Sequence, residues 1–255
     1  MEDKNPLFSI ITVTYNASGT VGRTMQSVKS QSFHDYEHIL MDGVSSDKTM
    51  DIIKSEATEM THVISSPDNG IYDAMNKALG VARGQYVIFL NAGDKFHASD
   101  TLAKIARAIK DNNLPGIVYG QTDLVDNDGS YLGPRHLTAP DTLTLDSFKK
   151  GMLVCHQAFV ALRRIAPLYD TRWKYSADYE WCIRCLQHSR KNIYIDTTII
   201  DYLSEGMTTA NHKASLKERF KIMCHYYGTL PTIWRHIGFF IRNRRRQRTG
   251  SANIQ

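Results

Sequence analysis

The chain has 255 residues, 42% hydrophobic and 22% charged, which suits one large or two small globular domains with a sizeable core and excludes a need for disulfide bonds. No apolar run approaches the roughly 18 residues of a membrane-spanning helix, and no signal peptide is expected at the start. The formal net charge is +5, and much of the excess lies in the arginine-rich stretch 242–248, so we expect no nucleic-acid partner.

The first half of the chain alternates strand and helix patterns. Runs rich in β-branched and apolar residues predict strands over residues 8–14, 37–41, 61–65 and 85–90. Apolar residues at helical spacing predict helices over residues 19–32, 47–59, 70–82 and 101–111. Ser46 or Asp47 is expected to cap the second of these helices. Because helices of this length separate the strands, we expect right-handed crossovers and an α/β fold, with a mainly parallel central sheet flanked by helices.

The pattern changes after Pro115, where the elements become shorter. The sequence predicts strands over 117–121, 124–125, 193–195 and 199–203, a turn at 127–129 and a helix over 175–188. Helical spacing resumes near residue 215, and Pro231 is expected to start another helix. We therefore predict one continuous domain over residues 6–205 and a C-terminal helical extension over residues 206–248 that ends in the basic tail.

Two of the four cysteines, Cys182 and Cys185, form a C-x-x-C pattern. No second pair lies at the spacing of a zinc ribbon, and the neighbouring residues are typical of a helix rather than of a metal-binding knuckle. We therefore interpret these cysteines as buried or half-buried thiols, with a metal or redox role as the lesser alternative. The cysteine pattern suits a reducing compartment, which agrees with a cytoplasmic protein.

Polar clusters follow each of the first four predicted strands. In chain order they are Thr14-Tyr15-Asn16, Asp42-Gly43, Pro67-Asp68-Asn69-Gly70 and Asn91-Ala92-Gly93-Asp94. Because parallel strands bring their carboxyl ends to one edge of a sheet, where open α/β sheets bind ligands, we expect the four turns to converge. Each turn alone is weak evidence, since turns are rich in these residue types, and Asp42, Asp68 and Asp94 are also candidates for helix N-caps.

The chain has no glycine-rich phosphate loop of the dinucleotide-binding or P-loop kind. We therefore expect a metal ion to hold any bound phosphate, and Asp94 is the leading ligand because hard cations prefer oxygen atoms. Asn91 is expected to reach the metal or a ribose hydroxyl. Asp42 is placed to accept from the imide N–H of a pyrimidine base, and Tyr15 to stack on the ring of that base.

Four motifs together carry a resemblance to a known family. They are SIITVTYN at 9–16, MDGVSSDKT at 41–49, PDNGIYDAMNKA at 67–78 and FLNAGD at 89–94. In order and spacing, along roughly residues 6 to 205, they resemble the inverting glycosyltransferases of family 2, which have the Rossmann-like GT-A fold. The subgroup that the chain resembles builds capsule, exopolysaccharide or lipopolysaccharide glycans in bacteria.

The resemblance implies a nucleotide-sugar site and a metal site. The implied nucleotide-sugar site comprises Thr14, Tyr15, Asn16, Asp42, Asp68, Asn76 and Asn91. Asp94 matches the metal-binding end of the family's D-x-D element, which implies Mn²⁺ or Mg²⁺, whereas Asn91 and Gly93 stand where many members carry aspartates. A single carboxylate is chemically sufficient, because Mg²⁺ keeps several waters and takes only one or two carboxylates plus phosphate.

The resemblance also implies a catalytic base, Asp178. An inverting transfer needs one base to take the proton of the attacking acceptor hydroxyl, while a metal on the leaving diphosphate replaces an acid. The alternative is a charge that stabilises a helix N-terminus. Glu180 follows Asp178 by two residues, so on a helix its side chain is expected to point in a different direction from that of Asp178. His156 and Gln157 match a motif on the acceptor or diphosphate side, with a partly buried histidine as the alternative, and residues 206–209 resemble a loop that folds over the donor.

The sequence therefore predicts a metal-dependent transferase that moves a sugar from a nucleotide-sugar, UDP-sugar by preference, to a glycan or lipid-linked acceptor. One alternative is a nucleotidyltransferase, whose glycine-rich loop is absent here. Another is a non-catalytic nucleotide-sugar-binding module, which the presence of Asp94 and Asp178 opposes. The aromatic segment from Trp234 to Arg248 predicts either peripheral attachment to an anionic membrane, at the inner face of the cell membrane, or a helix packed on the domain. A homodimer is also compatible with the sequence.

Overall fold

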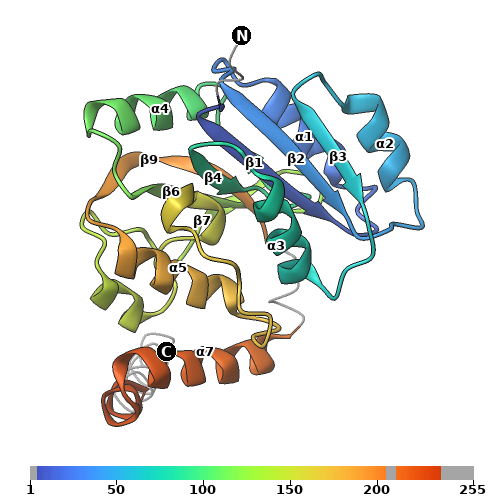
Figure 1. Cartoon of the computed structure of the whole chain (residues 1–255). Helices are drawn as coiled ribbons and strands as arrows, with labels where there is room; N and C mark the ends of the chain where they lie inside the picture. Colours follow the sequence, from blue (N-terminus) through green and yellow to red (C-terminus); the bar gives the residue numbers. More distant parts are fainter. Residues whose placement is uncertain (1–4, 205–210, 237–255) are drawn as a thin grey trace, which may run out of the picture.

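A nine-stranded sheet forms the centre of the computed structural model, which describes residues 5–204 and 211–236 (Figure 1). Within these residues the strand order is β3-β2-β1-β4-β8-β6-β9-β5, and β7 pairs with β6. The strands are β1 (Phe8–Thr14), β2 (Tyr36–Asp42), β3 (Thr61–Ser65), β4 (Tyr86–Phe89), β5 (Lys95–Phe96), β6 (Ile117–Val125), β7 (Tyr131–Pro134), β8 (Phe159–Leu162) and β9 (Asn192–Leu203).

Helices pack on both faces of the sheet and complete a three-layer α/β fold (Figure 1). One face is covered by α1 (Val21–Lys29), α2 (Thr49–Glu56) and α4 (Thr101–Asp111), and the other by α3 (Ile71–Val81), α5 (Ala177–His188) and α7 (His212–Tyr227). Short 3₁₀ turns are η1 (Leu145–Lys150), η2 (His156–Ala158) and η3 (Arg163–Ile165). Successive strand side chains point to opposite faces, so the same strands supply both apolar cores. The predicted α/β class is confirmed.

The first four strands make the parallel half of the sheet. β1 pairs in parallel with both β2 and β4, and β2 pairs in parallel with β3. Thr14 is the register partner of Asp42, and Asp42 that of Ser65, so the ends of β1, β2 and β3 lie side by side. β4 ends one residue after Ile88, at Phe89, and its chain turns directly into residues 91–94. The predicted convergence of these strand ends at one edge is confirmed.

The second half of the sheet is mixed rather than parallel. β8, which was not predicted, runs antiparallel between β4 and β6. Its four apolar residues carry no periodicity that separates a strand from a helix. β6 and β9 are each continuous where two shorter strands were expected, and they pair in parallel with register shifts near Gln121. Such irregularities interrupt the alternation of apolar and polar residues, so the sequence pattern divides each strand in two.

The helix ends also differ from the prediction by a few residues. α2 begins at Thr49, and the Asp47 side chain accepts a hydrogen bond from the Thr49 backbone N–H at 2.9 Å. Asp47 therefore satisfies the first turn from a position outside the helix, and Ser46 instead donates its backbone N–H to Asn16. The N-cap residue is Lys48, so the prediction that Ser46 or Asp47 caps this helix is wrong, and the helix itself is shorter than 47–59.

Cys182 and Cys185 are buried in α5 next to Trp181, within the apolar layer that this helix shares with the sheet. Burial raises the pKa of both thiols well above the usual value. Metal binding and redox exchange both need the thiolate, which such surroundings disfavour. The interpretation of the C-x-x-C as buried thiols is confirmed.

The C-terminal helices pack on the same layer as α5. α7 contributes Ile222 and Met223 to that core, and a further helix occupies residues 229–236 with Pro231 in its first turn, where a missing N–H is tolerated. The predicted loop at 206–209, the domain boundary at 205 and the segment 237–248 with its arginines lie outside the described residues. Within the described part of the chain, every helix is too short or too polar to cross a bilayer.

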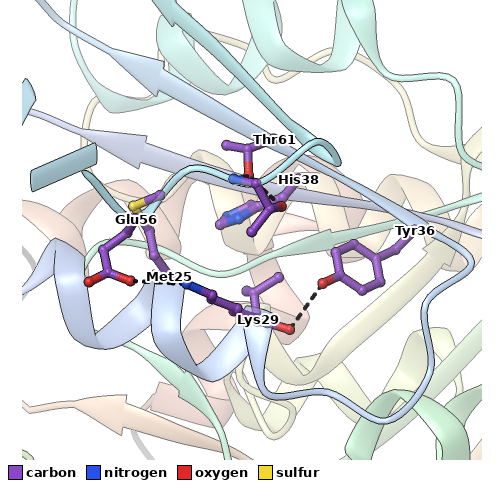
Figure 2. A pocket seen from close by; sticks show the side chains of 8 residues that line it. Met25, Lys29, Tyr36, His38, Glu56 and Thr61 are labelled. Atoms are coloured by element: carbon purple, nitrogen blue, oxygen red, sulfur yellow. Dashed lines mark hydrogen bonds and ion pairs between the residues drawn. The ribbon is translucent and has the colours of Figure 1, made fainter. Parts of the chain in front are cut away.

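His38 is buried in β2 beside a cavity about the size of one water molecule (Figure 2). Its Nε2 lies 2.9 Å from Thr12 Oγ1, and burial lowers the pKa of the imidazole to about 3. Tyr36, Lys29 and Glu56 line the same cavity, and the last two form an ion pair at 3.8 Å. His38 is therefore a neutral core histidine.

We expect acid to destabilise the fold through His38. In the unfolded chain the His38 imidazole has its ordinary pKa of 6.5 and takes up a proton there, whereas in the folded chain its pKa is about 3. The contribution is therefore fully present above pH 6.5 and is lost as the pH falls toward 3, by about 1.4 kcal/mol per pH unit. Urea unfolding at several pH values measures the slope. His38→Gln should reduce the dependence of the unfolding free energy on pH. His34→Gln changes an exposed histidine and should leave this dependence as in wild type. Equal pH dependence in the two variants would contradict the role of His38.

Candidate active site

The turn after β4 presents Asp94 at the carboxyl edge of the sheet, where the residue is 2% exposed. Its Oδ1 accepts a hydrogen bond from Leu203 N and its Oδ2 accepts one from Gln157 Nε2, each at 2.9 Å. Burial raises the pKa of Asp94 to about 7, and these hydrogen bonds oppose the rise. The strand β5 follows at once, so the N-cap alternative for Asp94 is wrong. Residues from the second half of the chain hold this carboxylate in place.

Gly93 explains why the turn carries only one carboxylate. Its φ is +106°, a region that favours glycine. A Cβ at this position would lie 2.5 Å from Leu203 Cδ2. The Gly93 carbonyl also accepts hydrogen bonds from Arg23, at 3.1 Å from Nε and 2.7 Å from Nη2. An aspartate at 93 would be strained and would collide with β9.

Asn91 offers a second oxygen in the same turn. Its Oδ1 is buried and has no hydrogen-bond partner, whereas its backbone oxygen accepts from Asp94 N at 2.9 Å. A buried acceptor without a partner costs about 1–3 kcal/mol. Carboxylate and amide oxygens are donor atoms that Mg²⁺ and related hard cations take. By the chemistry of their donor atoms, Asp94 and Asn91 fit a divalent cation.

Asp42 is saturated by hydrogen bonds from its own chain. Oδ1 accepts from Thr14 Oγ1 at 3.1 Å and from the Ser45 hydroxyl, while Oδ2 accepts from Ser45 N at 3.1 Å and Ser65 Oγ at 2.7 Å. Burial alone would raise the pKa of Asp42, but the hydrogen bonds outweigh it and hold the pKa below its usual value. This fully buried carboxylate joins the ends of β1, β2 and β3 and offers little to a nucleotide base.

Tyr15 and Asp68 flank Gly43 at the outer end of these strands. The Tyr15 side chain is 68% exposed, and Asp68 Oδ1 accepts from Gly70 N at 2.8 Å. A Cβ on Gly43 would lie 2.6 Å from Asp68 Oδ2 and 3.3 Å from Tyr15 Cδ2. An exposed ring next to a carboxylate combines a stacking surface with a hydrogen-bond acceptor. Asp68 and Tyr15 therefore lie on either side of Gly43.

Two asparagines of the predicted donor site anchor loops. Asn16 Oδ1 accepts from Ser46 N at 2.9 Å, and Asn16 N donates to Ser45 Oγ at 2.8 Å. Asn76, on α3, accepts from Tyr169 N at 2.6 Å and donates to Tyr169 O at 3.0 Å. Both ends of the Asn76 amide are therefore used within the chain, and this residue holds the segment before α5 against α3.

Asp178 lies in the first turn of α5 and is partly buried. Its Oδ1 accepts from Tyr72 Oη at 3.1 Å and from Tyr179 N at 2.9 Å. Burial, followed by the negative charge of Asp178, raises the pKa of Tyr72 well above its usual value, so the phenol stays a donor. Within the described residues no group bonds to Asp178 Oδ2. Glu180 is instead paired with Tyr226, which confirms that it points elsewhere.

The turn η2 connects the Asp94 and Asp178 corners. Gln157 reaches Asp94 Oδ2, and its own Oε1 accepts from Cys155 Sγ at 3.0 Å. Burial is the main cause of the raised pKa of Cys155, and the carboxylates of Asp94 and Asp178 both add to it. The two carboxylates therefore lie within electrostatic reach of one thiol, although they come from opposite halves of the chain.

His156 lies inside an aromatic cluster and is 3% exposed. Its Nε2 is 2.6 Å from Tyr169 Oη, and its ring stacks on Phe89 with the centroids 4.9 Å apart. Burial lowers the pKa of His156 to about 4. These contacts favour the alternative of a satisfied buried histidine.

A second group of potential ligands lies directly after β5 and on β6 and β9. His97, Asp123 and Asp201 each bring one donor atom within 4.8 Å of the others. Lys95 Nζ lies 3.0 Å from Asp201 Oδ2, and His97 Nδ1 lies 2.7 Å from Asp201 Oδ1. The lysine already supplies a cation to this cluster, so the turn with Asp94 is the better site for a metal ion.

Sequence reasoning gave no role to Tyr72 and Arg23. Tyr72 lies inside the 67–78 motif, so the motif was a signal, but its hydrogen bond to Asp178 joins α3 to α5 across the fold. Arg23 holds the carbonyl of Gly93 only because α1 packs beside the turn after β4. No local pattern marks either contact.

Comparisons with known proteins agree with this arrangement. The model of the family Glycosyl transferase family 2 matches residues 9–166. The PGL/p-HBAD biosynthesis glycosyltransferase of Mycobacterium tuberculosis is 33% identical over 190 residues, which cover 72% of this chain and 71% of that protein. The putative teichuronic acid biosynthesis glycosyltransferase TuaG of Bacillus subtilis is 34% identical over 157 residues, which cover 60% of this chain and 61% of TuaG.

A solved structure supports the fold. S. aureus TarS 1–349 in complex with UDP-GlcNAc has a TM-score of 0.68 with this chain at 18% identity, covering 85% of this chain and 64% of the TarS chain. The mixed sheet with helices on both faces is therefore the GT-A fold that the motifs implied. The expectation of a transferase is confirmed over the two alternatives: the chain belongs to glycosyltransferase family 2 and is a glycosyltransferase.

Proposed function

We propose that this enzyme moves one sugar from a nucleotide-sugar to a glycan or lipid-linked acceptor, with a divalent metal ion and with inversion of the anomeric carbon. The observation that carries the proposal is that η2 links the two carboxylates. Gln157 of η2 donates to Asp94, and His156 of η2 contacts Tyr169, whose ring stacks on the Tyr72 that donates to Asp178. Asp94 is buried beside an amide oxygen without a partner, and Asp178 keeps one oxygen free of described partners. An inverting transfer needs a group that manages the leaving diphosphate and a base for the acceptor.

Asp178 acts as the general base in this proposal. Its Oδ2 takes the proton of the acceptor hydroxyl as the hydroxyl oxygen bonds to the anomeric carbon from the face opposite the diphosphate. The bond from that carbon to the diphosphate oxygen breaks, and its electron pair leaves with the nucleotide diphosphate. Tyr72 and the Tyr179 N–H hold Oδ1 and thereby fix the orientation of the carboxylate.

The nucleotide lies at the outer ends of β1, β2 and β3. The exposed ring of Tyr15 stacks on the base, and Asp68 Oδ2 accepts from a base N–H, because the oxygens of Asp42 are already occupied. A carboxylate acceptor suits a base with a ring N–H, which uracil, thymine and guanine carry, and UDP is the favoured nucleotide among these. The similarity in fold to TarS, whose structure contains UDP-GlcNAc, supports the same choice.

Asp94 and Asn91 Oδ1 are the residues assigned to Mn²⁺ or Mg²⁺. When bound, the ion stabilises the negative charge that develops on the leaving diphosphate. Each carboxylate oxygen accepts at two lone pairs, so Asp94 keeps its hydrogen bonds from Leu203 N and Gln157 while it binds a cation. Those two donors fix the orientation of the carboxylate.

A screen for donors tests the proposed function. Purified protein is offered UDP-, GDP- and dTDP-sugars with Mn²⁺, with Mg²⁺ and with a chelator, and calorimetry and slow hydrolysis of the donor are measured. We expect binding to one nucleotide class, strengthened by the metal. If no nucleotide-sugar binds under any condition, the proposal is wrong.

The acceptor side of the proposal rests on the C-terminal helix. Leu230, Ile233 and Trp234 lie three and four residues apart on the helix at 229–236, so they share one face. Their exposed fractions are 71%, 38% and 70%. An apolar helix face ahead of an arginine-rich segment is typical of proteins that lie on anionic membranes, where lipid-linked acceptors are found.

We expect Leu230→Ala combined with Trp234→Ala to weaken binding to vesicles that contain phosphatidylglycerol. Each large apolar side chain buried in the interface contributes about 1.5–3 kcal/mol, so the loss should be at least about tenfold in vesicle affinity. Co-sedimentation measures it. Tyr131→Ala removes an aromatic ring that is 65% exposed on β7 and serves as the matched control. Unchanged co-sedimentation of the double variant would show that the helix does not bind membranes.

A further inference from the structure

The helix α7 lies beside α5 (Figure 1), and its side chains contact the residues that directly precede α5. Ser176 Oγ lies 2.9 Å from Ser215 Oγ. Glu218 accepts hydrogen bonds at 3.0 and 2.8 Å from two consecutive backbone N–H groups that precede α5. These contacts fix α7 relative to the first turn of α5, so a side chain on α7 is held in a defined position beside the base.

Arg219 is the cation that α7 brings to this corner. Its guanidinium carbon lies 6.0 Å from the centre of the Tyr179 ring. The raised pKa of Tyr72 comes from burial first and the charge of Asp178 second, and the positive charge of Arg219 partly opposes it. The guanidinium is therefore near both the residue that follows Asp178 and the phenol that donates to it.

The Arg219 side chain has no hydrogen-bond or ion-pair partner among the described residues. Its Nε is buried and makes no hydrogen bond, and no ion pair within 4.0 Å joins the guanidinium to a described carboxylate. Glu218, its neighbour, is occupied by backbone N–H groups, and Glu180 by Tyr226 and Arg184. A buried donor of a charged group that stays unpaired costs free energy, so an anion is expected to complete the site.

The other arginines near the two carboxylates are already used. Arg23 donates to the carbonyl oxygens of Gly93 and Asn127, and Arg135 to those of Leu137 and Met152. Asp94 and Asp178 both bring negative charge to a place where a nucleotide diphosphate is proposed to bind. An arginine whose donors are not used within the chain adds positive charge for an anionic substrate at this corner, in addition to the proposed metal ion.

We infer that Arg219 binds a phosphate group of the substrate beside Asp178. The planar guanidinium presents paired N–H donors that match two phosphate oxygens, and such charge-assisted hydrogen bonds are among the strongest in proteins. This inference rests on the proposed transferase function and extends it. The phosphate belongs either to the diphosphate of the donor or to a phosphate-linked acceptor, and the same chemistry serves both.

The first experiment uses inorganic pyrophosphate as the probe and does not depend on sugar transfer. Calorimetry with Mg²⁺ compares wild type with Arg219→Gln, Arg219→Lys and the control Lys217→Gln, which removes an exposed charge from the same helix. We expect Arg219→Gln to weaken pyrophosphate binding about tenfold or more. The pyrophosphate affinity of Arg219→Lys should lie between those of wild type and Arg219→Gln, because lysine keeps the positive charge but lacks the paired N–H donors of the guanidinium. Melting temperatures of all variants identify any loss of folding.

Initial rates then distinguish the two sources of phosphate. A donor phosphate predicts a raised KM for the nucleotide-sugar in Arg219→Gln, and an acceptor phosphate predicts a raised KM only for an acceptor that carries phosphate. Failure of wild type to bind pyrophosphate, or wild-type affinity in Arg219→Gln together with unchanged KM values, overturns the inference. Absence of transfer with every nucleotide-sugar would instead contradict the proposed function, while the pyrophosphate result still decides the role of Arg219.

Discussion

Asp178→Asn is expected to lower the kcat of sugar transfer by about a hundredfold to ten-thousandfold and to leave the affinity for the nucleotide-sugar unchanged. The asparagine has the same size, and its carbonyl oxygen still accepts from Tyr72 and from Tyr179 N, so the fold and the donor site persist. What is lost is the group that takes the acceptor proton. Initial rates and calorimetric donor binding measure the two effects separately, and the limb of the pH–rate profile that reports ionisation of the base should disappear.

Two further variants make this result specific. Asp111→Asn removes a carboxylate from the exposed end of α4 and should retain the wild-type rate. Tyr72→Phe deletes one hydrogen bond to Asp178 Oδ1 and should cost about fivefold, since a single neutral donor contributes about 1 kcal/mol. Wild-type transfer by Asp178→Asn would remove Asp178 from the mechanism, while the family and the fold would stand.

Asp94→Asn is expected to lower kcat/KM by at least about a hundredfold and to raise the metal concentration needed for half-maximal activity. The substitution removes the only carboxylate of the turn after β4, so the ion is held by amide oxygens alone. The new amide N–H₂ group would also face a hydrogen-bond donor, either Leu203 N or Gln157 Nε2, where Asp94 has an acceptor. The loss of that hydrogen bond should lower the melting temperature. Mn²⁺ titration in the presence of the nucleotide diphosphate measures the metal affinity directly.

The second carboxylate cluster supplies the control for this experiment. Asp123→Asn removes a potential ligand beside His97 and Asp201, where Lys95 already pairs with Asp201. We expect its metal dependence to equal that of wild type. The opposite result, with Asp123→Asn losing the metal response and Asp94→Asn keeping it, would move the metal site from the turn after β4 to the face formed by β5, β6 and β9.

The local sequence pattern was sufficient to predict the strands and helices that carry the site. β3 and α4 have the predicted bounds, and β1, β2 and β4 lie within a residue of theirs, because buried runs of β-branched residues and helical spacing report directly on local burial. The meeting of the four strand ends followed from the parallel pairing of these strands. β8 and the two-residue β5 were missed, since each becomes a strand only by pairing with a distant partner.

The sequence by itself determined which strands end in polar turns, that Asp94 and Asp178 are the candidate carboxylates, and which family the chain resembles. Only the tertiary structure decided which of those side chains are free. The oxygens of Asp42 accept hydrogen bonds from Ser45 and Ser65, and the amide of Asn76 is bonded to Tyr169, whereas Asp178 accepts from Tyr72 through one oxygen only. The physical reason is that a hydrogen bond or a nearby charge depends on distance in space, and most of these partners lie on other elements, often far away in sequence.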